Sequence, residues 1–207
     1  MIKNIFFDIG NVLINIHTEV CIQYWADSAD LEKKEIRTAF SDDLHNAYEI
    51  GQLNDDQFYN GFKDRLPKPC CLKKSDFWKG WNKILGKESS MVKVLKSISK
   101  DYNTWILSNT NPRHINDQLE KTNTFFEDIN GFIYSFNVGV RKLDPLIFKK
   151  ALKIAGSLPR ESLFIDDLIE NVESAKKLGF KVIHYNESLN LKNELELLGI
   201  NKNYDCK

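Results

Sequence analysis

The chain has 207 residues with 29 basic and 29 acidic side chains, so its formal net charge is zero. This balance argues against a nucleic-acid-binding surface as the main function, because such surfaces carry an excess of Lys and Arg. Hydrophobic residues make up 42% of the chain and charged residues 28%, which is typical of a globular protein with one or two domains and a substantial core.

Neither a membrane span nor a secretory signal is expected. Every apolar stretch falls short of the roughly 18 residues that a spanning helix needs. Asp8 interrupts the apolar N-terminal run within the length of a signal peptide. The four cysteines show no metal-ligand spacing, and an adjacent pair is poorly suited to a mutual disulfide; they are Cys21, Cys70, Cys71 and Cys206. These features predict a cytoplasmic protein with reduced thiols.

The first predicted element is a short strand, Ile5–Phe7, whose continuous apolar character indicates burial on both faces. It ends at Asp8. The following stretch has helical periodicity and is too long for a single crossover connection. We expect about four helices in it, at residues 20–25, 31–40, from 55 to a stop at Pro67, and 76–85 before Gly86. The pattern therefore predicts an all-helical insertion after the first strand.

From Ser89 onward, strands and helices alternate. Ser89 and Ser90 are plausible caps for a helix with Met91 on its apolar face. Four further buried strands are predicted, at residues 103–107, 131–134, 162–165 and 181–184. Helices are predicted between them at residues 112–120, 145–155 and 170–178. This alternation predicts an α/β fold with a doubly wound, parallel, Rossmann-like sheet.

Acidic residues follow two of these strands. Asp8 ends the first, and Asp166 and Asp167 end the strand at 162–165. In an open α/β sheet the ligand crevice lies outside the carboxyl ends of the strands, so the three carboxylates are expected to meet there. Carboxylates packed together repel one another unless a cation lies among them. Oxygen ligands without a His or Cys cluster indicate Mg²⁺.

Two more polar groups are expected at the same edge. Ser108 and Asn109 follow the strand at 103–107 and offer a hydroxyl and a turn amide suited to phosphate oxygens. Lys142 comes just before an Asp-Pro helix start and can act as a point cation. A carboxylate nucleophile, a hydroxyl, a lysine and metal-binding carboxylates together indicate phosphoryl transfer, in which positioning and charge neutralisation do most of the catalysis.

With these motifs in order, the chain resembles the haloacid dehalogenase-like (HAD) hydrolase superfamily. The segment 7–12 is similar to its first motif, 107–110 to its second, Lys142 to its third, and Asp166-Asp167 with Asn171 to its fourth. The residues of the first two motifs further resemble those of small bacterial sugar-phosphate phosphatases of the glucose-1-phosphate type. The resemblance implies a core of residues 1–15 and 88–207 and a helical cap of residues 16–87.

The resemblance also implies a mechanism. Asp8 would attack the phosphorus of a small phosphorylated metabolite and form an aspartyl-phosphate. Mg²⁺ would be held by Asp8, the Gly10 carbonyl, Asp166 and Asp167, the last through water. Ser108 and Asn109 would hold phosphoryl oxygens, and Lys142 would pair with the attacking carboxylate and the phosphoryl charge. The predicted enzyme is thus a Mg²⁺-dependent phosphatase.

The chain departs from the usual family pattern at Gly10, where phosphatases carry a second Asp that serves as general acid and base. Positioned proton transfer contributes roughly 10²–10⁴-fold in rate. This departure leaves two alternatives open: a non-catalytic protein that binds a phosphorylated ligand or a partner, and a haloacid dehalogenase. The Asp166-Asp167 pair argues against the dehalogenase, because a metal-free site has no use for two extra carboxylates.

Several other residues have two interpretations. Asn171 either orients Lys142 or is an ordinary first-turn helix residue, and Asp167 could also cap that helix. The four histidines are expected to be structural or on the surface; they are His17, His45, His114 and His184. His17 is the possible exception, because it follows the first motif at the junction with the cap. Trp78 and Trp81 are expected in the cap core, and Tyr48, Glu49 and Gly51 could form a loop that faces the site.

Overall fold

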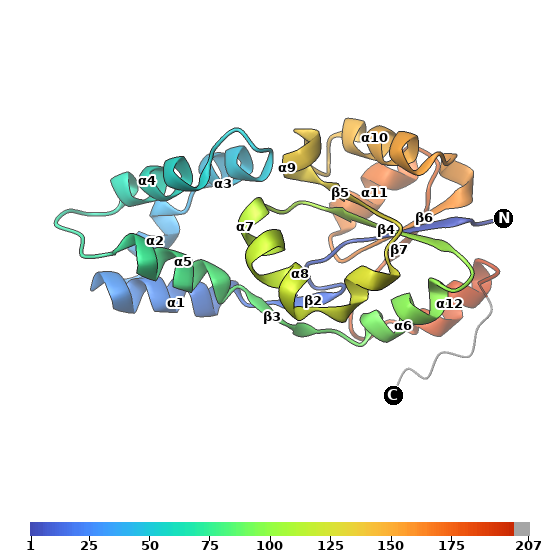
Figure 1. Ribbon diagram of the computed structural model, residues 1–207, viewed down its shortest axis with the longest axis horizontal. Helices are drawn as coiled ribbons and strands as arrows, with labels where there is room; N and C mark the ends of the chain where they lie inside the picture. The colour runs from blue at the N-terminus through green and yellow to red at the C-terminus, as the bar shows by residue number, and fades with distance from the viewer. Residues whose placement is uncertain (201–207) are drawn as a thin grey trace.

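The computed structural model describes residues 1–200, and its centre is a five-stranded sheet (Figure 1). The strands are all parallel and lie in the order β5-β4-β1-β6-β7. Because β1 lies between β4 and β6, residues that follow these three strands meet at one edge. The predicted parallel sheet is confirmed. The strands are β1 (Asn4–Phe7), β4 (Asn103–Ser108), β5 (Gly131–Tyr134), β6 (Ser162–Asp166) and β7 (Lys181–His184).

Helices cover both faces of this sheet, because successive residues of a strand point to opposite sides. In β1, Ile5 and Phe7 belong to one hydrophobic cluster and Phe6 belongs to another. The first cluster includes side chains of α6 and α12, and the second includes side chains of α10 and α11. These helices are α6 (Met91–Ile98), α10 (Pro145–Ala155), α11 (Ile169–Lys177) and α12 (Leu191–Leu197).

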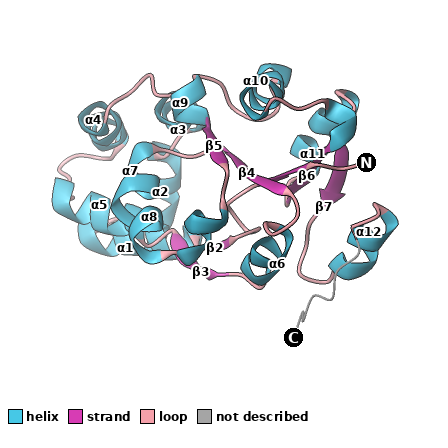
Figure 2. Cartoon of the chain, turned by 45° about the vertical axis from the view of Figure 1, so that its right-hand side comes forward, coloured by secondary structure: helices cyan, strands magenta, loops and turns pink. Residues whose placement is uncertain are grey.

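Residues 17–84, which lie between β1 and α6 in the chain, contain five helices and are called the cap. Their buried side chains form a separate hydrophobic cluster around Trp25, which is 1% exposed. Its ring stacks on Phe77, with centroids 4.8 Å apart, and its Nε1 donates to the Phe77 carbonyl at 2.8 Å. Both ribbon views show the cap beside the sheet, at the end away from the N-terminus (Figures 1 and 2). The cap helices are α1 (Thr18–Ala29), α2 (Lys33–Ala39), α3 (Asp42–Glu49), α4 (Asp55–Arg65) and α5 (Lys74–Asn82).

Two short antiparallel strands, β2 (Ile14–Ile16) and β3 (Leu85–Glu88), connect the cap to the core. The expectation of an uninterrupted helix over 76–85 was therefore wrong, because α5 ends at Asn82. Gly86 does not end a helix. It allows close packing in this ribbon, since a Cβ there would lie 2.9 Å from the Asn15 carbonyl and 2.5 Å from His17 Nε2. The predicted domain boundaries, near residues 15 and 88, fall within the two strands.

The cap also contains one helix more than the expected four, because α3 was missed. The helix expected over 112–120 consists of three short pieces with a π-helical middle. It begins with Pro112, and the Asn111 side chain accepts a hydrogen bond from the His114 N–H at 3.0 Å. The remaining short elements are α7 (Pro112–His114), η1 (Ile115–Leu119), α8 (Glu120–Thr122), η2 (Thr124–Asp128), α9 (Ser135–Val138) and η3 (Pro159–Glu161).

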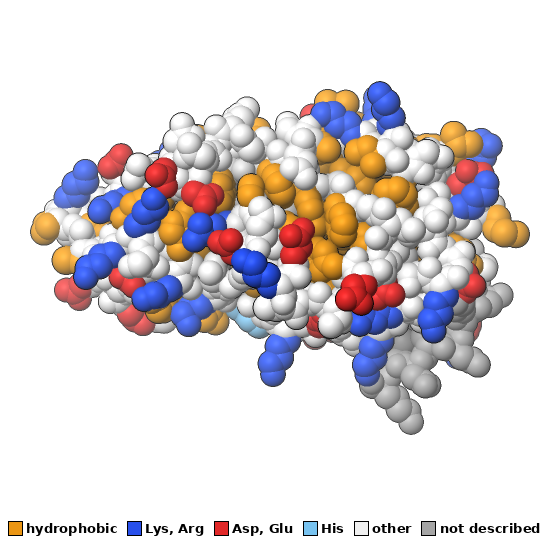
Figure 3. Space-filling view, in the orientation of Figure 1, with side chains coloured by type: hydrophobic (Ala, Val, Ile, Leu, Met, Phe, Trp, Pro, Cys, Tyr) orange, Lys and Arg blue, Asp and Glu red, His pale blue; other side chains and the backbone are white. Residues whose placement is uncertain are grey.

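Three further predictions concern membrane spans, surface charge and the cysteines. Among residues 1–200, no helix is both long and apolar enough to cross a membrane. On the face in Figure 3, basic and acidic side chains are interspersed over the cap, rather than segregated by sign. Cys21, Cys70 and Cys71 are free thiols, with Cys21 buried, and Cys206 lies outside the described residues.

Candidate active site

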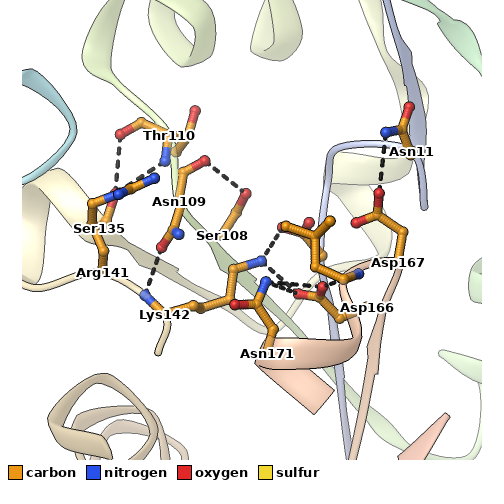
Figure 4. A network of polar contacts seen from close by, with 12 residues as sticks. Asn11, Ser108, Asn109, Thr110, Ser135, Arg141, Lys142, Asp166, Asp167 and Asn171 are labelled. Atoms are coloured by element: carbon orange, nitrogen blue, oxygen red, sulfur yellow. Dashed lines mark hydrogen bonds and ion pairs between the residues drawn. The ribbon is translucent and has the colours of Figure 1, made fainter. Parts of the chain in front are cut away.

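The core side of the site is formed by residues at the carboxyl ends of β1, β4 and β6 (Figure 4). Asp8 follows β1, and its N–H continues the sheet by donating to the Ile165 carbonyl at 3.0 Å. Ser108 is the last residue of β4, and Asp166 is the last residue of β6. All three side chains are buried, with Asp166 fully so. Their proximity follows from the sheet order, because β1 pairs with both neighbours.

Lys142 lies between the two buried carboxylates. Its Nζ is 2.6 Å from Asp8 Oδ1 and 2.7 Å from Asp166 Oδ2, and the residue is only 4% exposed. The backbone N–H of Lys142 donates to Asn109 Oδ1 at 2.7 Å, which ties this loop to the end of β4. Leu143, the next residue, has a φ of 86°, a left-handed conformation that is costly for a branched side chain. The turn that places Lys142 is therefore strained, as is common at functional sites.

Asn171 contacts the carboxylate that pairs with Lys142, and among residues 1–200 no hydrogen bond joins Asn171 to Lys142 itself. Its Nδ2 donates to both oxygens of Asp166, at 2.9 and 3.1 Å. Asp166 Oδ1 also accepts from the Leu168 N–H at 2.8 Å. Asn171 is buried on α11, so its position is fixed by helix packing. We infer that it orients Asp166, and through that carboxylate the position of Lys142.

Asp167 has a different environment from Asp166. It is partly exposed, and its Oδ2 accepts a hydrogen bond from Asn11 Nδ2 at 3.1 Å. Leu168 is the N-cap of α11, so Asp167 directly precedes the helix N-terminus, where a negative charge is favourable. Asn11 has a φ of 51° and also accepts the Ile16 N–H at 3.1 Å, so the turn after β1 orients Asp167.

These carboxylates suit a hard divalent cation. Asp8, Asp166 and Asp167 each offer an oxygen, and the three oxygens lie within 4.8 Å of one another. Asp8 Oδ1 is buried and is paired with the Lys142 ammonium at 2.6 Å. A donor set made only of carboxylate oxygens fits the preference of Mg²⁺.

Burial and the neighbouring charges together set the protonation of the site. Burial raises the pKa of Asp8 to about 7, and the charge of Asp166 adds to this, while Lys142 and Ser108 lower the pKa. Burial also raises the pKa of Asp167. For Lys142 the two carboxylates outweigh burial, and its pKa is raised, so the lysine stays charged. A cation among the carboxylates would relieve the repulsion that raises the Asp8 pKa.

A cavity of about 300 Å³ lies above these groups and brings core and cap residues together. Asp8, Ser108, Lys142 and Asp167 line its core side. Its other polar residues from the core include Asn11, Asn109, Thr110, Asn111, Arg141 and Asn171. The cap and its connecting ribbon contribute Ile16, Thr18, Phe40, His45, Glu49, Trp81, Ile84 and Leu85. The site is thus a pocket closed by two parts of the chain that are distant in sequence.

Glu49 is the residue on the cap side whose role the sequence did not resolve. It lies at the end of α3, not in a loop, and is 6% exposed. Its Oε2 is 2.7 Å from Arg141 Nε, and its Oε1 is 3.3 Å from His45 Nε2. Arg141 also donates to Asn46 on α3. Arg141 directly precedes Lys142, so a partly buried ion pair connects the cap to the loop that carries Lys142.

The other residues with two interpretations divide between cavity and core. Tyr48 packs in the cap core, where its ring stacks on Phe58, and Gly51 lies against the Phe136 backbone. Trp78 and Trp81 are both buried in the cap cluster, but Trp81 also lines the cavity.

Among the histidines, His45 and His114 line the cavity, whereas His17 precedes α1 and does not. His114 has a structural role, because both of its ring nitrogens have polar contacts. Its Nε2 is 3.3 Å from the Trp81 carbonyl and its Nδ1 is 3.2 Å from Asn111 Nδ2. Burial lowers its pKa to about 4, which keeps the ring neutral. His184 Nε2 lies 2.8 Å from the Asp167 carbonyl.

A parallel α/β core that gathers buried carboxylates and a lysine beneath a helical cap defines a class of hydrolases. The chain belongs to it: the family described as haloacid dehalogenase-like hydrolase matches residues 2–179. The resemblance noted in the motifs is therefore confirmed.

Individual relatives cover nearly the whole chain. It is 26% identical to a D-ribitol-5-phosphate phosphatase of Bacteroides thetaiotaomicron over 96% of this chain and 98% of that one. It is 24% identical to a sesquiterpene phosphatase of Aspergillus oryzae over 90% and 91%. A solved structure of a HAD family enzyme of Bacteroides thetaiotaomicron, in complex with magnesium and inorganic phosphate, superposes with a TM-score of 0.81. It is 26% identical, over 93% of this chain and 98% of that one.

Proposed function

We propose that the protein is a Mg²⁺-dependent phosphatase that hydrolyses a small phosphate monoester, of the sugar or polyol phosphate class. One observation carries the proposal: Lys142 Nζ lies 2.6 Å from Asp8 and 2.7 Å from Asp166, at the bottom of a cavity. The similarity to a D-ribitol-5-phosphate phosphatase and to a magnesium and phosphate complex supports the same chemistry.

Asp8, Asp166, Asp167 and the Gly10 carbonyl would hold Mg²⁺. When bound, the ion neutralises negative charge on the phosphoryl group and on the surrounding carboxylates. Asp8 follows β1 directly, so its side chain is held at a fixed point, and the strand ends bring Asp166 beside it. Gly10 needs no side chain for this role, because only its backbone oxygen takes part.

Asp8 attacks phosphorus in line, which forms a bond from its carboxylate oxygen and breaks the ester bond to the leaving alcohol. Water then attacks the aspartyl-phosphate, releases inorganic phosphate and regenerates the carboxylate. This path replaces one difficult step with two easier ones. Lys142 offsets the charge that develops on the phosphoryl oxygens, and Ser108 and the Asn109 amide hold those oxygens in place.

Proton transfer to the leaving alcohol is the weak point of this site, because position 10 is a glycine. A Cβ at Gly10 would meet only Ile16 side-chain atoms, at 3.4 and 3.8 Å, and Asp8 Oδ2 at 4.0 Å. These are ordinary contacts, so neither space nor backbone conformation requires glycine here. We infer that the lack of a carboxylate at position 10 reflects the reaction that the enzyme catalyses. It favours substrates whose leaving groups need little protonation.

The two alternative functions, a dehalogenase and a non-catalytic binding protein, receive less support. A dehalogenase needs no cation, yet Asn171 and Asn11 hold Asp166 and Asp167 in place. A protein that only binds phosphorylated ligands would have no need for Asp8 to lie in contact with Lys142. Relatives named as phosphatases also favour catalysis.

Release of inorganic phosphate tests the proposal. The protein should hydrolyse p-nitrophenyl phosphate and at least one sugar or polyol phosphate in Mg²⁺, and excess chelator should stop both reactions until Mg²⁺ is restored. A protein that releases no phosphate from a broad panel of monoesters in Mg²⁺ would be a binding protein. Full activity in excess chelator would instead favour metal-free chemistry.

A further inference from the structure

The cavity presents a buried carboxylate to whatever leaving group enters it. Glu49 is 6% exposed and lines the cavity from α3. Its Oε2 lies 2.7 Å from Arg141 Nε in an ion pair, and its Oε1 lies 3.3 Å from His45 Nε2. An ionised carboxylate can accept about four hydrogen bonds. These two contacts leave Glu49 with acceptor capacity beside the space that a substrate would occupy.

The positive charges around the cavity are already balanced. Lys142 contacts Asp8 and Asp166, and Arg141 contacts Glu49. Among the described residues that line the cavity, these two are the only Lys or Arg side chains. A second phosphate or a carboxylate on the substrate would therefore meet the Glu49 charge without a free cation, and an unpaired buried charge is strongly disfavoured.

Apolar surface lies next to this acceptor. Phe40 and Trp81 line the same cavity from the cap, and their rings are 5.8 Å apart at the centroids. The His45 ring packs against both, with its centroid 5.1 Å from that of Phe40 and 5.7 Å from that of Trp81, and it contacts Glu49. An uncharged carbon chain with hydroxyl groups matches this wall, since its C–H groups can contact the rings while a hydroxyl donates to Glu49.

We propose that Glu49 is the residue that selects the leaving group, and that the substrate is a monoester of an uncharged, polyhydroxylated alcohol. This inference rests on the proposed phosphatase function and specifies its substrate. A hydroxyl of the alcohol donates to Glu49, and a second anionic group is rejected. Arg141 and His45 are positioning residues, which hold the carboxylate at the cavity wall.

The test compares Glu49→Gln with the unmodified protein on a pentitol phosphate, p-nitrophenyl phosphate and phosphoglycolate, all in Mg²⁺. Glutamine keeps an acceptor oxygen but loses the charge that strengthens the hydrogen bond, so kcat/KM for the pentitol phosphate should fall about tenfold. The rate on p-nitrophenyl phosphate, which has no hydroxyl to donate, should change less than about threefold. Phosphoglycolate should be the poorest substrate of the unmodified protein and should improve in the variant.

Two variants serve as controls. Glu49→Asp keeps the charge but shortens its reach, so it should weaken pentitol phosphate hydrolysis without improving phosphoglycolate. Asp64→Asn makes the same charge change at a cap side chain that is 77% exposed and should change none of the three rates. Equal loss on the pentitol phosphate and on p-nitrophenyl phosphate in Glu49→Gln would overturn the inference.

Binding separates this inference from the proposed function. Calorimetry on Asp8→Asn in Mg²⁺ should show the pentitol phosphate binding more tightly than phosphoglycolate, and adding Glu49→Gln should remove that preference. If this preference is found in a protein whose unmodified form releases no phosphate, the phosphatase proposal fails and the assignment of Glu49 stands. If no preference is found, the assignment of Glu49 fails even though phosphate is released.

Discussion

The core side of the cavity and the cap side differ in how they hold charge. On the core side, buried Asp8 and Asp166 share one lysine and follow strands whose order fixes their positions. On the cap side, Glu49 comes from a short helix and is joined to the core through Arg141. We infer from this difference that residues at the rigid strand ends catalyse the reaction and that residues of the cap select the substrate. Variants on the two sides should therefore affect different kinetic quantities.

The largest effect is expected from Asp8→Asn on the core side. An amide is a poor nucleophile, so kcat should fall by at least about 10³-fold on every substrate. The fold should persist, because the residue follows β1 rather than packing in the core. Phosphate release and far-UV circular dichroism measure the two properties. Activity within about threefold of the unmodified protein would remove Asp8 from the mechanism.

Gly10→Asp adds a carboxylic acid to the core side of the cavity and leaves the cap side unchanged. The rate on simple alkyl phosphates should rise by up to roughly 10²-fold, because their leaving groups need a proton. The rate on an aryl phosphate should change little. A Cβ at position 10 makes only ordinary contacts, and the backbone there needs no glycine, so the fold should persist. If the unmodified protein already hydrolyses aryl and alkyl phosphates equally fast, another acid is in place and this explanation of Gly10 fails.

Asn171→Ala should weaken metal binding without changing substrate preference. Its side chain holds both oxygens of Asp166, and loss of such a supporting contact typically costs about 10- to 100-fold in metal affinity. The Mg²⁺ concentration for half-maximal activity should rise accordingly. Glu173→Ala, at a half-exposed position of the same helix, is the matched control. An unchanged Mg²⁺ requirement in Asn171→Ala would show that Asp166 needs no such support.

The smallest effect is a pH dependence of Mg²⁺ binding. Burial raises the pKa of Asp8 to about 7, so below that pH the carboxyl group of the metal-free protein is protonated. Magnesium must then displace a proton, and its affinity should fall by up to about tenfold for each pH unit below 7. The affinity should level off above that pH. Calorimetry between pH 5.5 and 8, a range of about two units around this pKa, measures the slope. Affinity that does not change with pH would contradict the raised pKa.

The core side could be predicted from the sequence to a large extent, because continuous apolar runs mark buried parallel strands. Residues directly after such runs have their positions fixed by the sheet, which is why Asp8, Ser108 and Asp166 could be placed together. The partner of Asn171 could not be predicted, since the sequence does not show which way a helix presents its first turn.

The cap side was predicted less well for physical reasons. Helix α3 has few buried residues and one of them is Glu49, so its apolar pattern is weak. The strands β2 and β3 are short and only partly buried, which leaves no alternation to detect. The role of Glu49 depends on Arg141, 92 positions later in the printed sequence, and no local pattern indicates such a long-range ion pair.

The central claim is that Asp8 carries the phosphoryl group during turnover. Rapid acid quenching of the protein during hydrolysis of p-nitrophenyl phosphate in Mg²⁺, followed by mass spectrometry of its peptides, tests this directly. We expect the mass of one phosphoryl group on the peptide that contains Asp8 in the unmodified protein. That mass should be absent from Asp8→Asn and from protein treated with chelator. Phosphate release with no phosphorylated peptide at any quench time, or with the group on another residue, would contradict this claim.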